Sequence, residues 1–375
     1  MRQSKDQRRR LGVAAALVDG EIVEGDVEIE RDRIMAVGLG RPGRGLAIPA
    51  LVDLQINGYA GVDFSGGSPD DYRRAERTML ADGVGAYQPT VITAPEANLL
   101  AALGRSSRAI AAWAPGGARP IGIHLEGPFF SPALPGIHPP GAIRNPDLGL
   151  TQRLLDAGPI SFLTLAPELP GALELIRWLC ERGVTVSCGH TNATYAEAVA
   201  GFDAGATSVT HLFNCMRPLG HRDPGILSAA LLREDVSIGL IADHDHIAPE
   251  VLEIVRRIAG DRICLVTDAT APAQAPDGVY PVGDVEVTRL NGKARRSDGR
   301  IGGSVTPLLE CVRKFIEAGA PLVWAVRAAS AVPANLVGRP DLGRLAVGGP
   351  ADIVVVDDSF QLQSVLAHGV ETGDG

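Results

Sequence analysis

Four side chains with metal-binding or acid–base chemistry each stand at the end of a short apolar run. They are Glu126, His190, His211 and Asp268. Two imidazoles and a carboxylate form a ligand set that leaves open positions for water, as in catalytic rather than structural zinc-type sites. Asp268 then remains as an acid or base that can move protons. Because the four residues are distant in the sequence, this chemistry requires a fold that gathers the ends of several strands.

Each of these residues has a simpler explanation when it is considered alone. A histidine at the end of a strand is more often hydrogen-bonded or solvated than bound to a metal. Glu126 fits a helix cap or an ion pair, and Asp268 fits a helix N-cap, a position that Asp favours. None of these explanations accounts for all four residues at once, so the metal site is the working hypothesis.

The chain from residue 50 onward alternates short β-branched apolar runs with helical segments. Eight runs are predicted to be strands: Ala50–Asn57, Ala86–Ile92, Pro120–Gly127, Ile160–Glu168, Val184–Thr191, Ser208–Asn214, Val236–His244 and Ile263–Thr270. Between them, helical periodicity predicts helices such as Pro69–Asp82, Pro95–Trp113, Ala172–Arg182, Thr194–Ala204 and Pro249–Ala259. Eight strand–helix pairs predict an α/β fold, a (β/α)8 barrel of the TIM type. In such barrels the chemistry collects at the carboxyl ends of the strands.

Two segments outside the barrel also have strand patterns. Ala14–Val37 alternates with breaks at Asp19-Gly20, Glu24-Gly25 and Asp32, and near the other end Gly343–Val356 and Leu362–His368 alternate as well. We expect these ends to form one small β domain, with residues 1–49 and 339–375 flanking a catalytic barrel at 50–338. The segment Val285–Gly299 contains Asn291-Gly292 and Asp298-Gly299 and predicts a hairpin, which either covers the site or decorates the rim.

Composition narrows the possible partners. The chain has 375 residues, 45% of them hydrophobic, and a formal net charge of −9. This charge disfavours nucleic acid and anionic membranes as partners, so an anionic substrate has to be bound by local groups. Met1–Arg10 lacks the apolar stretch of a signal peptide, and no segment reaches the roughly 18 apolar residues that span a bilayer, so we expect a cytoplasmic protein. Five cysteines without CxxC spacing are expected to be reduced: Cys180, Cys188, Cys215, Cys264 and Cys311.

Five ordered motifs carry a family resemblance. They are GIHLEGPFFSPALPGIHPPGAIR from Gly122, SCGHTNATYAEA from Ser187, THLFNCMRPLGHRDPG from Thr210, LIADHDHI from Leu240 and LVTDATAPA from Leu265. Together they resemble the N-acetylglucosamine-6-phosphate deacetylases of the amidohydrolase superfamily. The resemblance runs from about Pro49 to about Gly303 and implies a barrel with a β-sandwich built from both termini. It also implies a homodimer and hydrolysis of the acetyl amide of N-acetylglucosamine 6-phosphate.

The resemblance implies a role for each matching residue. Glu126, His190 and His211 would bind the metal, and Asp268 would be the catalytic acid/base. Contacts to the amino sugar and its phosphate would come from Ile137, His138, Asn214, Cys215, Arg222 and His246, with Arg222 typically reaching the phosphate from the neighbouring subunit. Ile301, Gly302 and Gly303 would border the acyl pocket. A metal in this site would lower the pKa of bound water toward about 7, and Asp268 would carry its proton to the sugar nitrogen.

One departure from the wider superfamily affects the metal count. Many amidohydrolases end the first strand in His-x-His, which holds a second metal, but Gln55 and Asn57 stand here. Neutral amides are poor ligands for transition metals, so we predict one divalent ion per subunit, with zinc preferred and iron(II), cobalt or manganese as alternatives. Gln55 and Asn57 are expected to form hydrogen bonds at the barrel mouth. Cys188 and His124 are expected to pack beneath the site, and His221 and His244 to be solvated loop residues.

Three other functions stay open at this stage. The substrate could be the galactosamine epimer, since that choice depends on one hydroxyl group and on loop geometry. Another amidohydrolase reaction is the second alternative, but such enzymes often bridge two metals with a modified lysine, and no lysine follows a predicted strand here. A non-catalytic metal-binding protein is the third. It would be expected to have lost Asp268 or a ligand, yet all are present.

Overall fold

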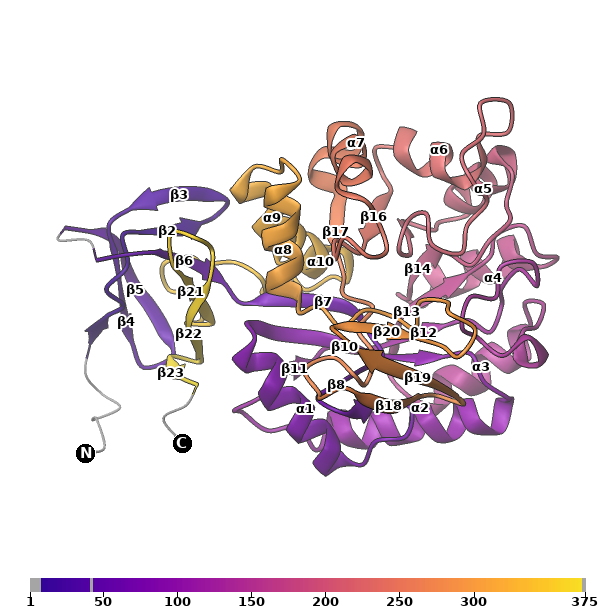
Figure 1. The fold of residues 1–375 in the computed structure, drawn as a ribbon, viewed down its shortest axis with the longest axis horizontal. Helices are drawn as coiled ribbons and strands as arrows, with labels where there is room; N and C mark the ends of the chain where they lie inside the picture. Colours follow the sequence, from indigo (N-terminus) through magenta and orange to yellow (C-terminus); the bar gives the residue numbers. More distant parts are fainter. Residues whose placement is uncertain (1–7, 41–42, 373–375) are drawn as a thin grey trace.

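The computed structural model describes residues 8–40 and 43–372, and predictions made for residues outside these ranges are not tested by it. Figure 1 shows a barrel ringed by helices and, beside it, a smaller β part built from the indigo and yellow ends of the chain. Every helix in the described ranges is too short or too polar to cross a bilayer.

The barrel contains all eight predicted strands in chain order. They are β7 (Leu51–Ile56), β10 (Val84–Ile92), β12 (Ile123–Glu126), β13 (Ile160–Leu165), β14 (Thr185–Cys188), β15 (Ser208–Val209), β16 (Ser237–Leu240) and β17 (Ile263–Leu265). Each strand pairs in parallel with the next, and a parallel bridge between Ile56 and Ala269 joins the last strand to the first. The predicted (β/α)8 fold is therefore confirmed.

A helix follows each barrel strand. They are α1 (Pro69–Ala81), α2 (Glu96–Ala111), α3 (Leu148–Ala157), α4 (Ala172–Cys180), α5 (Tyr195–Asp203), α6 (Gly225–Leu232), α7 (Pro249–Ala259) and α8 (Leu308–Glu317), with α9 (Leu322–Ala328) and α10 (Ala331–Leu336) after them. Local sequence begins two of them clearly, because Ser68 caps α1 and Thr194 caps α5, each in a reciprocal capping box. The strands are buried on both faces, by the lumen and by these helices, which explains their nearly continuous apolar runs.

The small β part joins segments from both ends of the described chain. Its strands are β1 (Arg9–Arg10), β2 (Ala15–Val18), β3 (Glu21–Glu24), β4 (Asp26–Glu30), β5 (Arg33–Leu39), β6 (Leu46–Pro49), β21 (Ile353–Val356), β22 (Leu362–Ala367) and β23 (Val370–Glu371). β6 pairs antiparallel with β21, and a separate core that includes Val27 and Ile353 lies between the two sheets. The predicted domain boundaries remain a proposal.

The strand predicted over Gly343–Val356 is wrong in its first half, since only β21 forms there. Gly343 and Gly348 both have positive φ angles, and Pro350 cannot donate a ladder hydrogen bond, so the segment reaches β21 as a loop.

All five cysteines are unpaired, as predicted.

The predicted hairpin is part of a three-stranded antiparallel sheet. Its strands are β18 (Gly278–Val282), β19 (Val285–Leu290) and β20 (Lys293–Arg295). Asn291 and Gly292 connect β19 to β20 with positive φ at both residues, as a two-residue type I′ turn requires. Val282 and Val287 pack on Ile92, at the carboxyl end of β10, so the sheet lies at the barrel mouth.

The seam between the first and last barrel strands contains a buried carboxylate. Asp53 of β7 accepts hydrogen bonds from the Thr267 hydroxyl at 2.6 Å, the Thr267 backbone N–H at 3.3 Å and the Gln55 N–H at 3.2 Å. Burial raises its pKa from 3.8 to about 7, although these hydrogen bonds oppose the rise. Asp53 thus ties β7 to the residue that precedes Asp268.

We expect Asp53→Ala to lower the free energy of unfolding by about 1–3 kcal/mol, because it leaves buried donors of Thr267 without an acceptor. The folded carboxyl keeps its proton up to about pH 7, whereas the unfolded one loses it near 3.8. Its contribution is therefore complete below about pH 3.8 and is lost as the pH rises through about 7. Urea unfolding should show a larger difference from wild type at about pH 5 than at about pH 8.

The exposed Asp358→Ala serves as the matched control, and its unfolding free energy should stay within about 0.5 kcal/mol of wild type. Equal stability of Asp53→Ala and Asp358→Ala would show that the seam does not depend on this carboxylate.

Candidate active site

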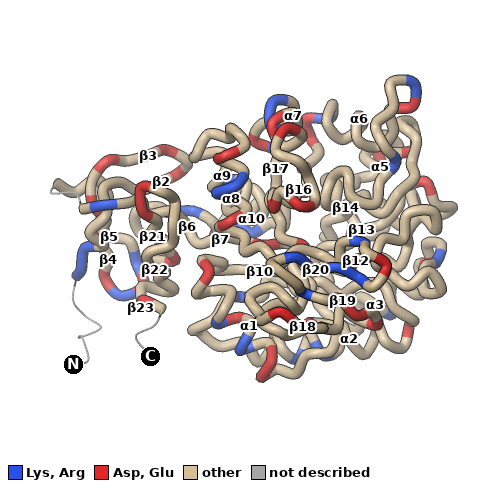
Figure 2. Tube along the Cα trace, in the orientation of Figure 1, with Lys and Arg blue, Asp and Glu red and all other residues tan. Residues whose placement is uncertain are grey.

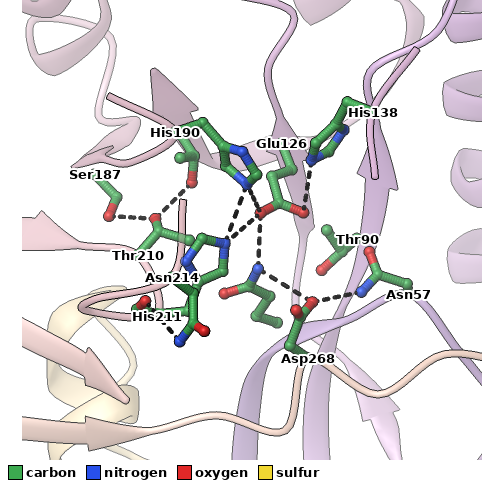
Figure 3. Close-up of polar contacts among 12 residues, drawn as sticks. Asn57, Thr90, Glu126, His138, Ser187, His190, Thr210, His211, Asn214 and Asp268 are labelled. Atoms are coloured by element: carbon green, nitrogen blue, oxygen red, sulfur yellow. Dashed lines mark hydrogen bonds and ion pairs between the residues drawn. The ribbon is translucent and has the colours of Figure 1, made fainter. Parts of the chain in front are cut away.

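The predicted residues meet at the carboxyl end of the barrel (Figure 3). Glu126 is the last residue of β12, while His190, His211 and Asp268 follow the ends of β14, β15 and β17. The last three have φ angles of 49°, 34° and 49°, in the left-handed region that non-glycine residues rarely adopt. Such conformations cost on the order of 1–3 kcal/mol each and cluster at functional sites. Here they turn three side chains from separate strands toward one point.

Three potential metal ligands form a nearly equilateral triangle. His211 Nε2 lies 3.1 Å and His190 Nε2 lies 3.3 Å from Glu126 Oε1, and the two nitrogens are 3.2 Å apart. A tetrahedral ion with bond lengths of about 2.0–2.1 Å requires ligand atoms roughly 3.3–3.4 Å apart. The chemistry and the spacing of this donor set therefore fit a divalent cation.

The electrostatics of the triangle are those of a buried anion held by two imidazoles. Burial opposes ionisation of Glu126, but hydrogen bonds from His190 and His211 outweigh it and hold the pKa of the carboxyl well below its usual value. Burial also lowers the pKa of His190, which leaves a neutral ring, and the nearby oxygen of Leu134 is 3.2 Å from its Nδ1. In this structure the proton on Nε2 donates to Glu126; metal binding at Nε2 would require the single proton to sit on Nδ1 instead, where it can donate to the Leu134 carbonyl.

His138 lies on the other side of the same carboxylate. Its Nε2 is 3.9 Å from Glu126 Oε2, and ligand atoms of Glu126, His138 and His190 all lie within 4.8 Å of one another. Burial lowers its pKa to about 3, so the ring is neutral at pH 7, and its Nδ1 is buried without a hydrogen-bond partner among the described residues. The sequence prediction assigned His138 to the substrate, as a contact to the sugar and to the developing oxyanion, whereas the structure also brings it within reach of a metal.

Asp268 lies beside this cluster and accepts hydrogen bonds from two side-chain amides. Asn57 Nδ2 donates to Asp268 Oδ1 at 2.7 Å, and Gln55 Nε2 lies 2.9 Å from Glu126 Oε1 and 3.3 Å from Asp268 Oδ1. The hydrogen bonds predicted for Gln55 and Asn57 are thus confirmed. Burial, followed by the negative charge of Glu126, raises the pKa of Asp268 to about 6, a value suited to proton transfer near neutral pH.

Three other predicted residues lie around the same mouth. His246 Nδ1 is 2.8 Å from Asp243 Oδ2. Asn214 donates from Nδ2 to the carbonyl of His211 at 3.2 Å. Cys215 follows with a φ of 52°, and its carbonyl accepts from the Thr191 N–H at 3.1 Å. These contacts place the residues at the site without assigning them a role.

The Ile301–Gly303 turn runs directly beside Asp268. Ser304 N–H donates to the Asp268 carbonyl at 3.0 Å, and the Thr270 hydroxyl donates to the Gly302 carbonyl at 3.0 Å. A Cβ at Gly303, whose φ is +83°, would lie 2.4 Å from the Thr270 side chain and 2.9 Å from the Asp268 carbonyl. Only glycine fits this approach. Ile137 lies across the mouth and packs against the β18–β20 sheet.

Arg222 is not brought to the cluster within one subunit. It lies in the exposed loop between β15 and α6, beside the exposed His221, and no residue that the structure describes forms a hydrogen bond or ion pair with its guanidinium.

The expectation of a solvated His244 is wrong. This residue is half-buried with a positive φ, and its Nε2 is inaccessible, because the loop after β16 turns it inward.

Sequence reasoning missed a hydrogen-bonded chain beneath the site. Ser187 Oγ is 2.6 Å from Thr210 Oγ1, Thr210 is 2.8 Å from Thr164 Oγ1, and Thr164 is 2.8 Å from His124 Nε2. His124 Nδ1 lies 3.2 Å from the carbonyl of Leu54, and burial lowers the pKa of His124 to about 4. The neutral ring therefore joins β12 to β7 and β13 rather than simply packing, and the rest of the chain extends to β14 and to the residue after β15. The sequence signal for His124 was its position two residues before Glu126, which places both side chains on the same face of the strand. Cys188 is in the core, as predicted.

Residues 46–372 match the model of the Amidohydrolase family. Among curated proteins, the N-acetylglucosamine-6-phosphate deacetylase of Homo sapiens is 38% identical over 345 residues, which cover 87% of this chain and 83% of that protein. The N-acetylgalactosamine-6-phosphate deacetylase of Escherichia coli O157:H7 is 35% identical over 328 residues, 86% of this chain and 87% of that protein.

Solved structures show the same likeness. The N-acetyl-D-glucosamine-6-phosphate deacetylase of Mycobacterium smegmatis, as an aspartate-to-alanine mutant in complex with N-acetyl-D-glucosamine-6-phosphate, is 35% identical with a TM-score of 0.92, over 98% of this chain and 99% of that one. The N-acetylglucosamine-6-phosphate deacetylase of Thermotoga maritima is 30% identical with a TM-score of 0.88, over 97% and 99%.

The ligand triangle predicts which substitutions abolish metal binding. Zinc added to chelator-treated protein should raise the melting temperature, and Glu126→Gln or His211→Asn should weaken zinc binding by at least about 100-fold, because each removes one of three ligands. His138→Asn should retain the metal, which separates it from His211. Metal content after dialysis measures both, with the exposed His368→Asn as control. Full zinc content in Glu126→Gln would contradict the assignment.

Proposed function

The chain belongs to the amidohydrolase family, and from this membership and its site we propose that it hydrolyses the N-acetyl amide of N-acetylglucosamine 6-phosphate. The products are glucosamine 6-phosphate and acetate. The observation that carries the proposal is the position of Asp268, with a pKa raised to about 6, next to the triangle of Glu126, His190 and His211 in one buried mouth. Relatives named for this reaction, at 33–38% identity over 86–87% of this chain, support the choice of substrate.

We propose one divalent metal ion per subunit, held by Glu126, His190 and His211. Zinc suits two imidazoles and a carboxylate best, and iron(II), cobalt and manganese are the alternatives. The ion would polarise the substrate carbonyl and acidify a water molecule. Gln55 supports a single ion, because its amide nitrogen already donates to Glu126 and faces Asp268, where a second cation would otherwise balance the two carboxylates.

In this mechanism Asp268 moves the proton. As a carboxylate it accepts a proton from the attacking water, and it then donates that proton to the sugar nitrogen so that the amine can leave. Asn57 and Gln55 hold its Oδ1, which orients the other oxygen toward the reacting groups. Neutral His138 donates a hydrogen bond to the oxygen that becomes negative during attack.

The remaining predicted residues bind the substrate in our proposal. His246, fixed by Asp243, contacts the sugar, and the turn Ile301, Gly302 and Gly303 borders the acetyl group next to Asp268. The loop of Asn214 and Cys215 supports the phosphate. Arg222 grips the phosphate from the neighbouring subunit of a homodimer, which is consistent with its exposed position and its lack of partners among the described residues.

The alternative substrate is N-acetylgalactosamine 6-phosphate, favoured by the similarity to a deacetylase named for it. A different amide is less well supported. No lysine lies at the end of a described barrel strand to bridge two metals, and the described triangle provides three close ligands for one ion. A cytoplasmic location remains a prediction.

Acetate release tests the proposal directly. The wild-type protein should release acetate from N-acetylglucosamine 6-phosphate, lose this activity on chelation and regain it with metal. Asp268→Asn should lower kcat by at least about 1,000-fold with metal content unchanged, because Asn cannot accept the proton. Because protonated Asp268 cannot act as the base, kcat/KM should fall with decreasing pH, with a midpoint at or below about 6 since a nearby cation favours the carboxylate.

Measuring acetate release from N-acetylglucosamine 6-phosphate and from N-acetylgalactosamine 6-phosphate identifies the preferred epimer. Absence of acetate from either phosphorylated sugar, with metal bound, would refute the deacetylase proposal, and substantial turnover by Asp268→Asn would remove Asp268 from the mechanism.

Arg222→Ala should raise KM for the phosphorylated sugar by about 10- to 100-fold and leave the unphosphorylated sugar unaffected, because only the phosphate contact is lost. Mixing Arg222→Ala with Asp268→Asn tests the source of the arginine. If Arg222 acts across the interface, mixed dimers contain one complete site and regain activity at low substrate concentration. No recovery in mixed dimers would place Arg222 in its own subunit, and an unchanged KM would remove it from the site.

A further inference from the structure

The β18–β20 sheet and the loop that follows it contain a cluster of cationic side chains. Five of the residues between 285 and 300 are cationic: Arg289, Lys293, Arg295, Arg296 and Arg300. Figure 2 shows blue segments along this sheet, in front of the barrel strands. The whole chain has a net charge of −9, so a cluster of cations at the barrel mouth is unusual for it. The residues of the metal site include no lysine or arginine, so these cations are not explained by metal binding.

Acidic partners cancel only part of this charge. Lys293 and Arg295 both pair with Asp245, at 3.0 and 2.8 Å. Arg296 and Arg300 both pair with Asp298, at 3.7 and 2.7 Å. Two carboxylates therefore face these four cations, so neither carboxylate fully neutralises its pair.

The same loop holds the backbone that precedes His138. Arg300 Nη1 donates to the carbonyl of Gly136 at 2.9 Å, and Arg296 Nη1 donates to the carbonyl of Ile137 at 3.2 Å. These contacts cross from the inserted sheet to the loop after β12. The sheet is therefore connected to the candidate site and does not only decorate the rim.

Arg300 retains free hydrogen-bond donors and solvent access. Asp298 accepts from Nε at 3.0 Å and from Nη2 at 2.7 Å, and Gly136 accepts from Nη1. A guanidinium has five N–H groups, so one remains on each terminal nitrogen, the number that a bidentate phosphate contact needs. Its side chain is 53% exposed.

Arg300 also lies next to the loop that contains Cys215. A Cβ at Gly136 would be 2.8 Å from Cys215 Sγ and 3.0 Å from His190 Cε1, so the backbone that Arg300 holds touches both. Burial raises the pKa of the Cys215 thiol to about 12, Glu126 and Asp268 add to the rise, and Arg300 is the cation that opposes it. Through its hydrogen bond to Gly136, the guanidinium is thus one backbone contact away from Cys215 and His190.

We propose that Arg300 binds the phosphate of the substrate from the same subunit that supplies the metal ligands, as a second cation in addition to Arg222. The inference rests on the proposed function and extends it by a specificity-determining residue. Two N–H groups of Arg300 contact the phosphate while Asp298 and Gly136 keep the guanidinium in place. The inserted sheet is then part of the substrate site.

Steady-state kinetics of Arg300→Ala on phosphorylated and unphosphorylated N-acetylglucosamine test this inference. KM for the phosphorylated sugar should rise about 10- to 100-fold with kcat within about threefold, because a charge-assisted contact to the ground state is lost. Values for the unphosphorylated sugar should not change. Arg300→Lys should recover part of the affinity, since an ammonium keeps the charge but not the bidentate geometry.

Lys293→Ala is the matched control, because it removes a positive charge from the same sheet and lies 61% exposed against Asp245. It should change KM by less than about threefold at physiological salt, where distant exposed charges are screened. If Lys293→Ala and Arg300→Ala raised KM equally, the effect would come from general electrostatic attraction, and the proposed direct contact between Arg300 and the phosphate would be wrong. An equal loss on both sugars, or a fall in kcat at constant KM, would reduce Arg300 to a residue that positions His138.

Binding separates this inference from the function it rests on. Calorimetry with glucosamine 6-phosphate and glucosamine requires no turnover, and Arg300→Ala should weaken only the phosphorylated ligand. If wild type binds glucosamine 6-phosphate through Arg300 but releases no acetate, the proposed reaction fails and the phosphate contact stands. If acetate is released but binding does not depend on Arg300 in a variant with wild-type melting temperature, the inference fails alone.

Discussion

A single carboxylate oxygen organises the centre of this protein. Oε1 of Glu126 lies 2.9 Å from Gln55 Nε2, 3.1 Å from His211 Nε2 and 3.3 Å from His190 Nε2, and all four residues are buried. A buried carboxylate is stable only when its charge is compensated by hydrogen bonds or a cation. Without a metal, three nitrogens from three other strands compensate the charge of Glu126. The two imidazoles are spaced so that a bound ion could compensate this charge instead.

The barrel architecture meets that constraint by fixing register and strand ends. Glu126 stands opposite Ile92 on one side and Thr164 on the other, and a slip of one residue would turn it out of the lumen. Beneath it, the chain of hydrogen bonds from Ser187 through Thr210 to His124 ties neighbouring strands together. Buried polar networks of this kind are costly when incomplete and rigid when every member is satisfied.

Much of this arrangement was predictable because it depends on periodicity. Apolar runs of the right length predicted all eight strands. Because equivalent strand ends in a parallel barrel lie at one mouth, these runs also predicted that Glu126 and Asp268 lie together. Loop conformations were not predictable in the same way. The approach of His138 to Glu126, the inward turn of His244 and the loop in place of a strand before Ile353 depend on positive φ angles and long-range contacts. Single-sequence patterns do not contain that information. Arg300 was missed for the same reason, since its partner Gly136 is 164 residues away.

The charges at the mouth also explain how an acidic protein can select an anionic substrate. At physiological salt the Debye length is about 8 Å, so the groups nearest the substrate matter more than the net charge of −9. The floor of the mouth contains the carboxylates of Glu126 and Asp268, whereas the inserted sheet at its rim has more cations than carboxylates. A molecule with a phosphate at one end and an amide at the other has one favourable orientation in this field. In the binding mode that we propose, the phosphate stays at the rim, and the amide enters toward the residues that would cleave it.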